Sequence, residues 1–157
     1  MPEVIQELTG LQNQKLTQVP PSAIRAFDNE ISAVDGIIKL TLGEPDFATP
    51  EHVKEAAIKS IQDDDSHYAP SAGKPELRQA IAKVLKKTRG VDYDWASEVT
   101  VTVGATEALT ATTFGLLNPG DKVLVPTPVF SLYFPIISLT GAIPVMVNTA
   151  DDGFVLT

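Results

Sequence analysis

The chain has 157 residues, of which 43% are hydrophobic and 20% charged, proportions typical of a soluble globular domain. The 12 basic and 20 acidic residues give a net charge of -8, which disfavours a nucleic-acid partner or an anionic membrane surface. There is no cysteine, so a disulfide framework and a thiolate metal site are excluded. Glu3 and Glu7 stand near the start without an apolar block, so we expect no signal peptide and a cytoplasmic location.

The first part of the chain predicts a polar arm followed by a helix and a turn. Residues 1–21 form the arm, and Ser22 can cap a helix whose apolar residues recur at helical spacing. Asp35-Gly36 ends that helix. A short apolar run at 37–42 then leads into a turn at 43–46.

Two further helices are expected before residue 90. Thr49-Pro50-Glu51 predicts a helix start with a capping hydroxyl, proline at the first position and an acid in the first turn. Asp63-Asp64-Asp65 is interpreted as a solvated helix end rather than a metal site, because no second cluster of ligands stands nearby. Another helix is predicted over 75–88, with Gly90 just past its end.

From residue 99 the pattern changes to alternating strands and helices. Residues 99–103 alternate with period two and predict a strand, and a helix follows through Leu117. Strands are expected at 122–125 and 143–147, with a helix between them that ends at Gly141. This order predicts parallel pairing through right-handed crossovers, and hence an α/β fold with flanking helices.

An uncharged stretch from Val123 to Ala150 is long enough to span a bilayer, but prolines punctuate it. We therefore interpret it as buried strands and a helix, and expect no membrane partner. The Ser71-Ala-Gly-Lys74 run matches a serine–lysine nucleophile pattern, but its companion motifs are absent, so we treat it as chance. His52 and His67 are isolated, so neither a catalytic triad nor a metal site is predicted.

The most informative local feature is the glycine that ends the predicted strand at 99–103. Gly104, Ala105 and Thr106 open the following helix, where backbone amides and the helix dipole favour an anion. The alternative is a tight turn with a helix cap, which local evidence alone favours. The glycine spacing matches neither a P-loop nor a dinucleotide fingerprint.

A second feature is the aromatic pair after the strand at 122–125. Phe130 or Tyr133 could stack on a flat ligand at the carboxyl ends of the strands. The alternative is that both are core residues.

These pieces, in this order, resemble the class I aminotransferases of fold type I, in particular bacterial aromatic and aspartate aminotransferases. The resemblance runs from about Ser22 to the last residue. It is carried by blocks at Leu42–Pro50, His67–Gly73, Glu76–Arg78, Val101–Leu109, Asn118–Val123 and Pro126–Tyr133.

The resemblance implies a pyridoxal 5'-phosphate cofactor and assigns roles by position. Gly43 matches the glycine whose amide meets the substrate carboxylate, and Gly104–Thr106 match the loop that binds the cofactor phosphate. Phe130 matches the aromatic stacked on the pyridine ring. Tyr68 matches the tyrosine that reaches the partner's cofactor phosphate across a homodimer interface.

The resemblance also implies that the chain is an N-terminal portion of the fold. The Schiff-base lysine would lie beyond residue 157, so we expect no catalytic residue in this chain and no activity from it alone. Residues 1–45 would form the arm and the first part of the small domain, and residues 46–157 the first part of the large cofactor-binding domain. The strand at 99–103 would lie at one edge of a sheet whose central strands come from elsewhere.

The implied activity of the whole protein is transfer of an amino group between an amino acid and a 2-oxo acid. Aromatic amino acids are the first substrate expectation, followed by a diaminopimelate derivative or aspartate. The alternatives are a carbon–sulfur lyase of the same fold and a non-catalytic dimerising module.

Overall fold

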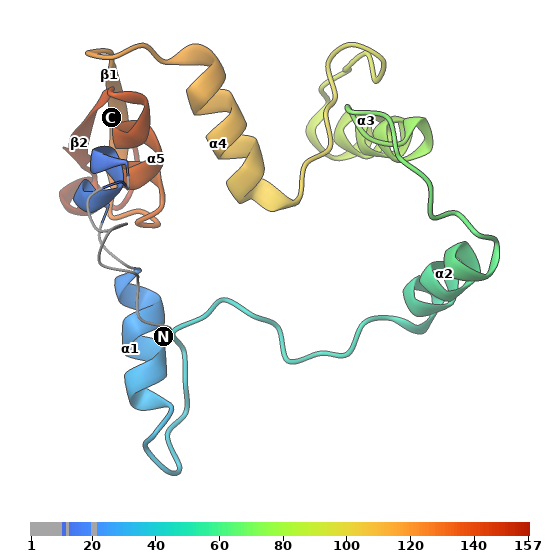
Figure 1. Ribbon diagram of the computed structural model, residues 1–157, viewed down its shortest axis with the longest axis horizontal. Helices are drawn as coiled ribbons and strands as arrows, with labels where there is room; N and C mark the ends of the chain where they lie inside the picture. The colour runs from blue at the N-terminus through green and yellow to red at the C-terminus, as the bar shows by residue number, and fades with distance from the viewer. Residues whose placement is uncertain (1–10, 12, 20–21) are drawn as a thin grey trace. The chain divides into compact units, whose positions relative to one another are not determined.

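The computed structural model describes residue 11, residues 13–19 and residues 22–157, and Figure 1 shows its elements. Most of the expected polar arm therefore lies outside the described residues. The chain divides into two compact units. We call residues 44–108 the continuous unit, and residues 1–43 together with 109–157 the discontinuous unit. None of the described helices combines the length and apolar character needed to cross a membrane.

In the continuous unit, helix α2 (Glu51–Gln62) confirms the helix expected there but corrects its cap. Pro50 itself is the N-cap residue, and no side chain caps the helix. The capping role expected for the Thr49 hydroxyl is therefore wrong, because Thr49 stands one position too early in the chain. The acidic residue expected in the first turn is confirmed, because Glu51 lies there and a negative charge is favourable at that end of a helix.

Helix α3 (Pro75–Arg89) follows the sequence prediction closely. Pro75 occupies the first turn, where its missing amide leaves no hydrogen bond unmade. Gly90 ends the helix in the left-handed conformation at φ 69°, and its amide donates to Lys86 O.

The strand expected at residues 99–103 is wrong for the described chain. These residues run from α3 to helix α4 (Gly104–Leu116) without a sheet partner among the described residues. Within the segment, the Val101 amide donates to the carbonyl of Ala72 at 2.9 Å. An alternating pattern favours an extended backbone, but a strand also requires a neighbour that supplies a ladder of hydrogen bonds.

The discontinuous unit contains the parallel pair that the sequence predicted. Strand β1 (Lys122–Thr127) pairs with β2 (Ile143–Asn148), in a register that joins Lys122 to Ile143 and Thr127 to Asn148. Helix α5 (Tyr133–Thr140) connects them and ends at Gly141, which has φ 90°. The short helix η3 (Ala150–Asp152) follows β2.

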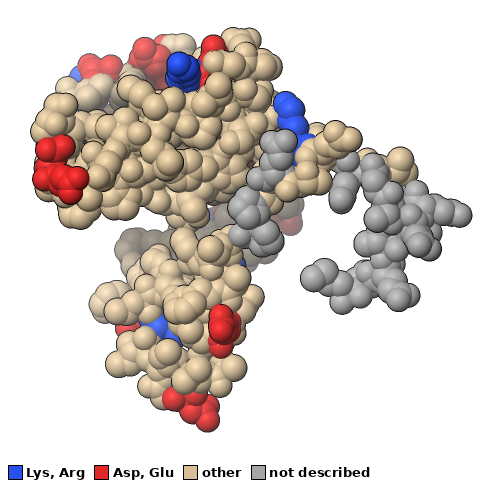
Figure 2. Space-filling model, turned by 90° about the vertical axis from the view of Figure 1, so that its left-hand side faces the viewer, with Lys and Arg blue, Asp and Glu red and all other residues tan. Residues whose placement is uncertain are grey.

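The core of this unit lies between β1 and α5. Val125, Ile137 and Ala142 are buried, and Ile137 is only 2% exposed. Tyr133 and other half-buried apolar residues pack against this cluster. Leu124 alternates with Val125 along β1 and is 69% exposed, so the opposite side of the strand is uncovered. In the view of Figure 2, most of the described surface that faces the reader carries neither Lys or Arg nor Asp or Glu.

Helix α1 (Ala23–Ile31) confirms the predicted cap, because the Ser22 hydroxyl accepts from the Arg25 amide at 3.4 Å. The hydrogen bond from the Thr41 hydroxyl, helped by the nearby Lys39 ammonium, holds the pKa of the Asp28 carboxyl below its usual range. These contacts attach the run at 37–42 to α1.

The described part of the N-terminal arm contains the short helix η2 (Gln14–Gln18), which packs against α5. The Lys15 ammonium donates to Leu139 O at 3.2 Å, close to the end of α5. A cation is favourable at the carboxyl end of a helix. This contact joins residues that are 124 positions apart in sequence.

Candidate functional site

The proposed phosphate loop lies at the start of α4. Gly104 has φ +76°, and a Cβ placed on it would meet no atom within 4 Å. Gly104, Ala105 and Thr106 form the first turn of the helix, the end at which the helix dipole favours an anion. This turn therefore combines an open backbone at Gly104 with a helix start, a place where anions bind favourably.

The segment before α4 is held by local hydrogen bonds. The Gly104 amide donates to Thr102 O at 2.8 Å, and the Thr102 hydroxyl donates to Gly104 O at 3.0 Å. The Val103 amide donates to the Glu107 carboxylate. Glu107 therefore folds back over the helix start, as the acid of a capping box does. Sequence reasoning missed this role, although an acid four residues after the end of an extended run could have indicated it.

Phe130 lies at the carboxyl end of β1, where ligands of parallel α/β folds bind. Phe130 is 56% exposed and is therefore accessible to a flat ligand. The end of β1 is anchored, because Thr127 O accepts both the amide and the hydroxyl of Thr149 at 2.9 Å. Tyr133 instead packs against the buried cluster of the discontinuous unit. Of the two aromatic candidates, Phe130 is therefore the better placed to stack on a flat ligand.

Tyr68 and Gly43 both lie in exposed loops. The Tyr68 side chain is fully exposed, so its hydroxyl is accessible to another molecule. A Cβ on Gly43 would meet no atom within 4 Å. Tyr68 and Gly104–Thr106 belong to the continuous unit, whereas Gly43 and Phe130 belong to the discontinuous unit.

Within the continuous unit, the structure links two of the predicted elements. Ala72 and Gly73 follow Tyr68 in the same loop, and Ala72 O accepts the amide of Val101. Val101 precedes Gly104 by a short extended segment. A backbone hydrogen bond thus joins the loop of Tyr68 to the segment that leads to the proposed phosphate loop.

The part of the chain that the structure describes contains no candidate metal site. No group of three or more His, Cys, Asp or Glu residues there could hold a metal ion. Several carboxylates instead make local hydrogen bonds and ion pairs. For example, Asp65 pairs with Lys74, and that ammonium holds the pKa of Asp65 below its usual value.

Comparison with known proteins identifies the family of this chain. Residues 35–157 match the model of aminotransferase class I and II. A probable N-acetyl-LL-diaminopimelate aminotransferase of Bacillus subtilis (strain 168) is 45% identical over 147 residues, covering 94% of this chain and 37% of that protein. Aromatic-amino-acid aminotransferase 2 of Thermococcus litoralis is 38% identical, covering 89% of this chain and 36% of that protein.

A solved structure shows the same relationship. Aspartate aminotransferase from Thermus thermophilus with maleate has a TM-score of 0.86 at 35% identity, covering 93% of this chain and 39% of that chain. The chain belongs to the class I and II aminotransferase family, and its fold is the N-terminal portion of the fold type I architecture. It spans less than two fifths of the length of these relatives.

Proposed function

We propose that this chain forms the N-terminal part of a pyridoxal-phosphate-dependent aminotransferase. The whole protein would move an amino group between an amino acid and a 2-oxo acid. The observation that carries this proposal is the 45% identity to an aminotransferase over 94% of the chain, which includes every block with a proposed site role. Residues 1–45 would then contribute to the small domain and residues 46–157 to the large one.

The first turn of α4 fits the cofactor phosphate. Gly104 leaves the backbone open, and the amides of Ala105 and Thr106 would donate to the phosphate oxygens together with the Thr106 hydroxyl. Because the binding groups are mainly backbone amides, the negative charge of the chain does not prevent anion binding there. The nearby Glu107 carboxylate accepts a hydrogen bond from the Val103 amide.

Phe130 would pack on the cofactor ring, and Gly43 would offer its amide to the substrate carboxylate. When bound, pyridoxal phosphate supplies an electron-withdrawing ring that stabilises negative charge at the α-carbon of the amino acid. Phe130 would orient that ring and exclude water from one of its faces. The lysine that moves the proton would come from sequence beyond this chain.

Tyr68 would serve the cofactor phosphate of a second subunit, so the working protein would be a cytoplasmic homodimer. Its full exposure supports this proposal, because a phenol that meets a partner cannot be buried in its own subunit. Aromatic amino acids remain the first substrate expectation. The relatives named above act, by their names, on diaminopimelate derivatives, aromatic amino acids and aspartate.

The test uses the full-length protein that carries these residues, with pyridoxal phosphate. Phenylalanine, tyrosine, aspartate and N-acetyl-diaminopimelate would be offered with 2-oxoglutarate, and 2-oxo acid formation would be followed. We expect product only when the acceptor is present, and none from residues 1–157 alone. Acceptor-independent breakdown of a sulfur amino acid would indicate the lyase instead. A protein that neither reacts nor retains cofactor would be a dimerising module.

A further inference from the structure

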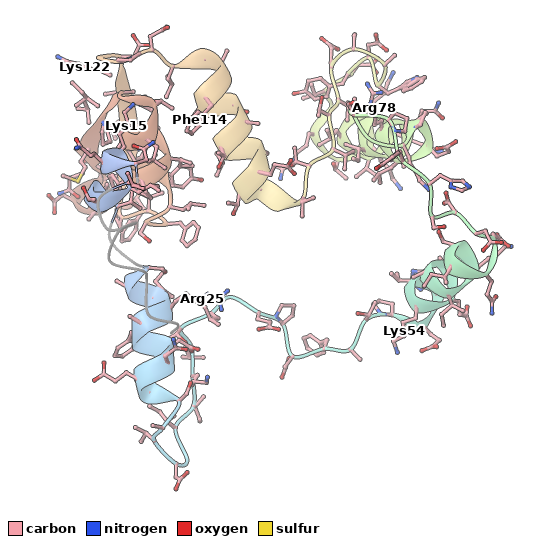
Figure 3. All side chains as sticks on the ribbon, viewed as in Figure 1. Lys15, Arg25, Lys54, Arg78, Phe114 and Lys122 are labelled. Atoms are coloured by element: carbon pink, nitrogen blue, oxygen red, sulfur yellow. The ribbon has the colours of Figure 1, made fainter. Side chains whose placement is uncertain are left out.

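Arg78 on α3 joins separate parts of the continuous unit (Figure 3). Its Nε donates to Val99 O at 2.7 Å, and one terminal nitrogen donates to Ala96 O at 2.7 Å. Its guanidinium carbon lies 5.6 Å from the centroid of the Trp95 ring, which is cation–π distance. Because the guanidinium is planar and always charged, these contacts fix both its position and its orientation.

The turn that Arg78 holds has its own internal order. The Asp94 carboxylate accepts from the Ser97 hydroxyl at 2.6 Å and from the Ala96 amide at 3.0 Å. The Asp94 amide donates to the Glu98 carboxylate at 2.7 Å. The turn at 94–98 is therefore closed by its own hydrogen bonds. Because Arg78 bonds to the Ala96 carbonyl within it, Arg78 restrains the turn as a whole.

From this turn the chain runs directly to the proposed phosphate loop. Val99 is buried, and the Val101 amide is held by Ala72 O at 2.9 Å. Only Thr102 and Val103 separate Val101 from Gly104. The carbonyls that Arg78 binds, those of Ala96 and Val99, thus lie a few residues before the amides proposed to bind phosphate.

We propose that Arg78 is a positioning residue for the phosphate loop, acting through the carbonyls of Ala96 and Val99. This inference rests on the proposed function, because it takes the site at Gly104–Thr106 as its starting point. A direct phosphate contact by Arg78 is disfavoured, since its donors are directed to backbone carbonyls and Trp95 stands against the guanidinium.

The test compares Arg78→Ala and Arg78→Lys with Arg89→Ala in the full-length apoprotein that carries these residues. Arg89 is a matched control, because it lies on the same helix, is exposed, and its side chain makes no hydrogen bond or ion pair with another described residue. The probe is pyridoxine 5'-phosphate, which lacks the aldehyde and cannot bond to surface lysines. Pyridoxine without phosphate is the control ligand. Calorimetry would measure both affinities, and circular dichroism would check that each variant keeps its helices.

We expect Arg78→Ala to weaken pyridoxine 5'-phosphate binding about tenfold, because charge-assisted hydrogen bonds are lost. Arg78→Lys should restore part of the affinity, and Arg89→Ala should change nothing. Amide hydrogen exchange at residues 101–106 should accelerate in Arg78→Ala, while that of α2 stays constant. The fluorescence of Trp95 should change in Arg78→Ala as well, because the guanidinium that lies 5.6 Å from its ring is lost.

Two results separate this inference from the proposed function. If the wild-type protein does not bind the phosphorylated probe, the phosphate site is wrong, and exchange then decides only whether Arg78 orders residues 101–106. Faster exchange at 101–106 then supports positioning, and unchanged exchange overturns it. If the wild-type protein binds and Arg78→Ala binds equally well, the inference is overturned while the phosphate site stands. An Arg78→Ala chain that fails to fold leaves the decision to Arg78→Lys on the same readouts.

Discussion

The backbone of Gly73 lies directly against the side chain of Val101. A Cβ on Gly73 would stand 2.7 Å from Val101 Cβ and 2.8 Å from its Cγ2, closer than real side chains approach. Gly73 also has φ +96°, a conformation that side-chain-bearing residues rarely adopt. The loop that carries Tyr68 and the segment that leads to Gly104 are therefore packed at a position where only glycine fits.

We predict that Gly73→Ala lowers the free energy of unfolding by about 1–3 kcal/mol through overpacking, in addition to backbone strain. Gly36→Ala is the matched control, because Gly36 has φ +74° but no neighbour within 4 Å. Chemical denaturation of both variants measures the difference. Equal losses would mean that the contact with Val101 has no energetic role.

Thr106→Pro should weaken cofactor retention strongly in the intact protein. Proline is tolerated in the first turn of a helix, so α4 should persist while an amide donor and the hydroxyl are both removed. Cofactor absorbance after dialysis gives the measurement, and Thr106→Ser, which keeps both groups, is the control. Unchanged retention in a folded Thr106→Pro protein would contradict the phosphate site.

Phe130→Leu should loosen the cofactor by about 0.5–1.5 kcal/mol and shift its absorption band, with little effect on stability. Tyr133→Leu should do the reverse, because Tyr133 packs against the buried cluster while Phe130 is 56% exposed. Thermal unfolding and cofactor spectra of the two variants provide the comparison. A larger spectral change in Tyr133→Leu would reverse the assignment.

Tyr68 should act in the partner subunit, so that the intact protein works as a dimer. Mixing a Tyr68→Phe protein with a variant lacking the cofactor-binding lysine should give hybrid dimers in which one site has both residues and the other has neither. Activity of the mixture is then expected to depend on subunit exchange. A monomer that remains fully active at high dilution would rule out this role.

Stability at low pH should depend on Asp94. The Ser97 hydroxyl and the Ala96 amide hold the pKa of its carboxyl below the ordinary value of 3.8. A lowered pKa means that this carboxylate stabilises the fold above the unfolded value, and that the contribution is lost as the pH falls through the lower folded value. Asp94→Asn should therefore flatten the decline in stability below about pH 4. Urea titrations across that range, with the exposed Asp46→Asn as control, test the effect.

The β1–α5–β2 arrangement could be predicted from sequence because its signals are local. Apolar runs, a helical segment and Gly141 together define a parallel pair with its crossover. The extended segment at 99–103 could not be assigned correctly in the same way. Its alternation is real, but pairing depends on a neighbouring strand that local sequence does not report.

The candidate site likewise contains residues that local sequence predicts and a residue that it does not. Gly104–Thr106 could be found from a glycine and small residues at a helix start, and Phe130 from its place after a strand. Arg78 could not, because its partners lie 18 and 21 residues away and no spacing rule connects them. Its role emerges only when the fold brings α3 against the turn at 94–98.

The division of the chain into a continuous and a discontinuous unit has a consequence for protein synthesis. Residues 44–108 form a compact unit that is continuous in sequence, so most of its contacts can form while the ribosome is still extending the chain. The other unit must wait, because Lys15 finds Leu139 only after 124 more residues have been added. Helix η2 is thus translated before α2 and α3, yet its packing partner α5 is translated after both.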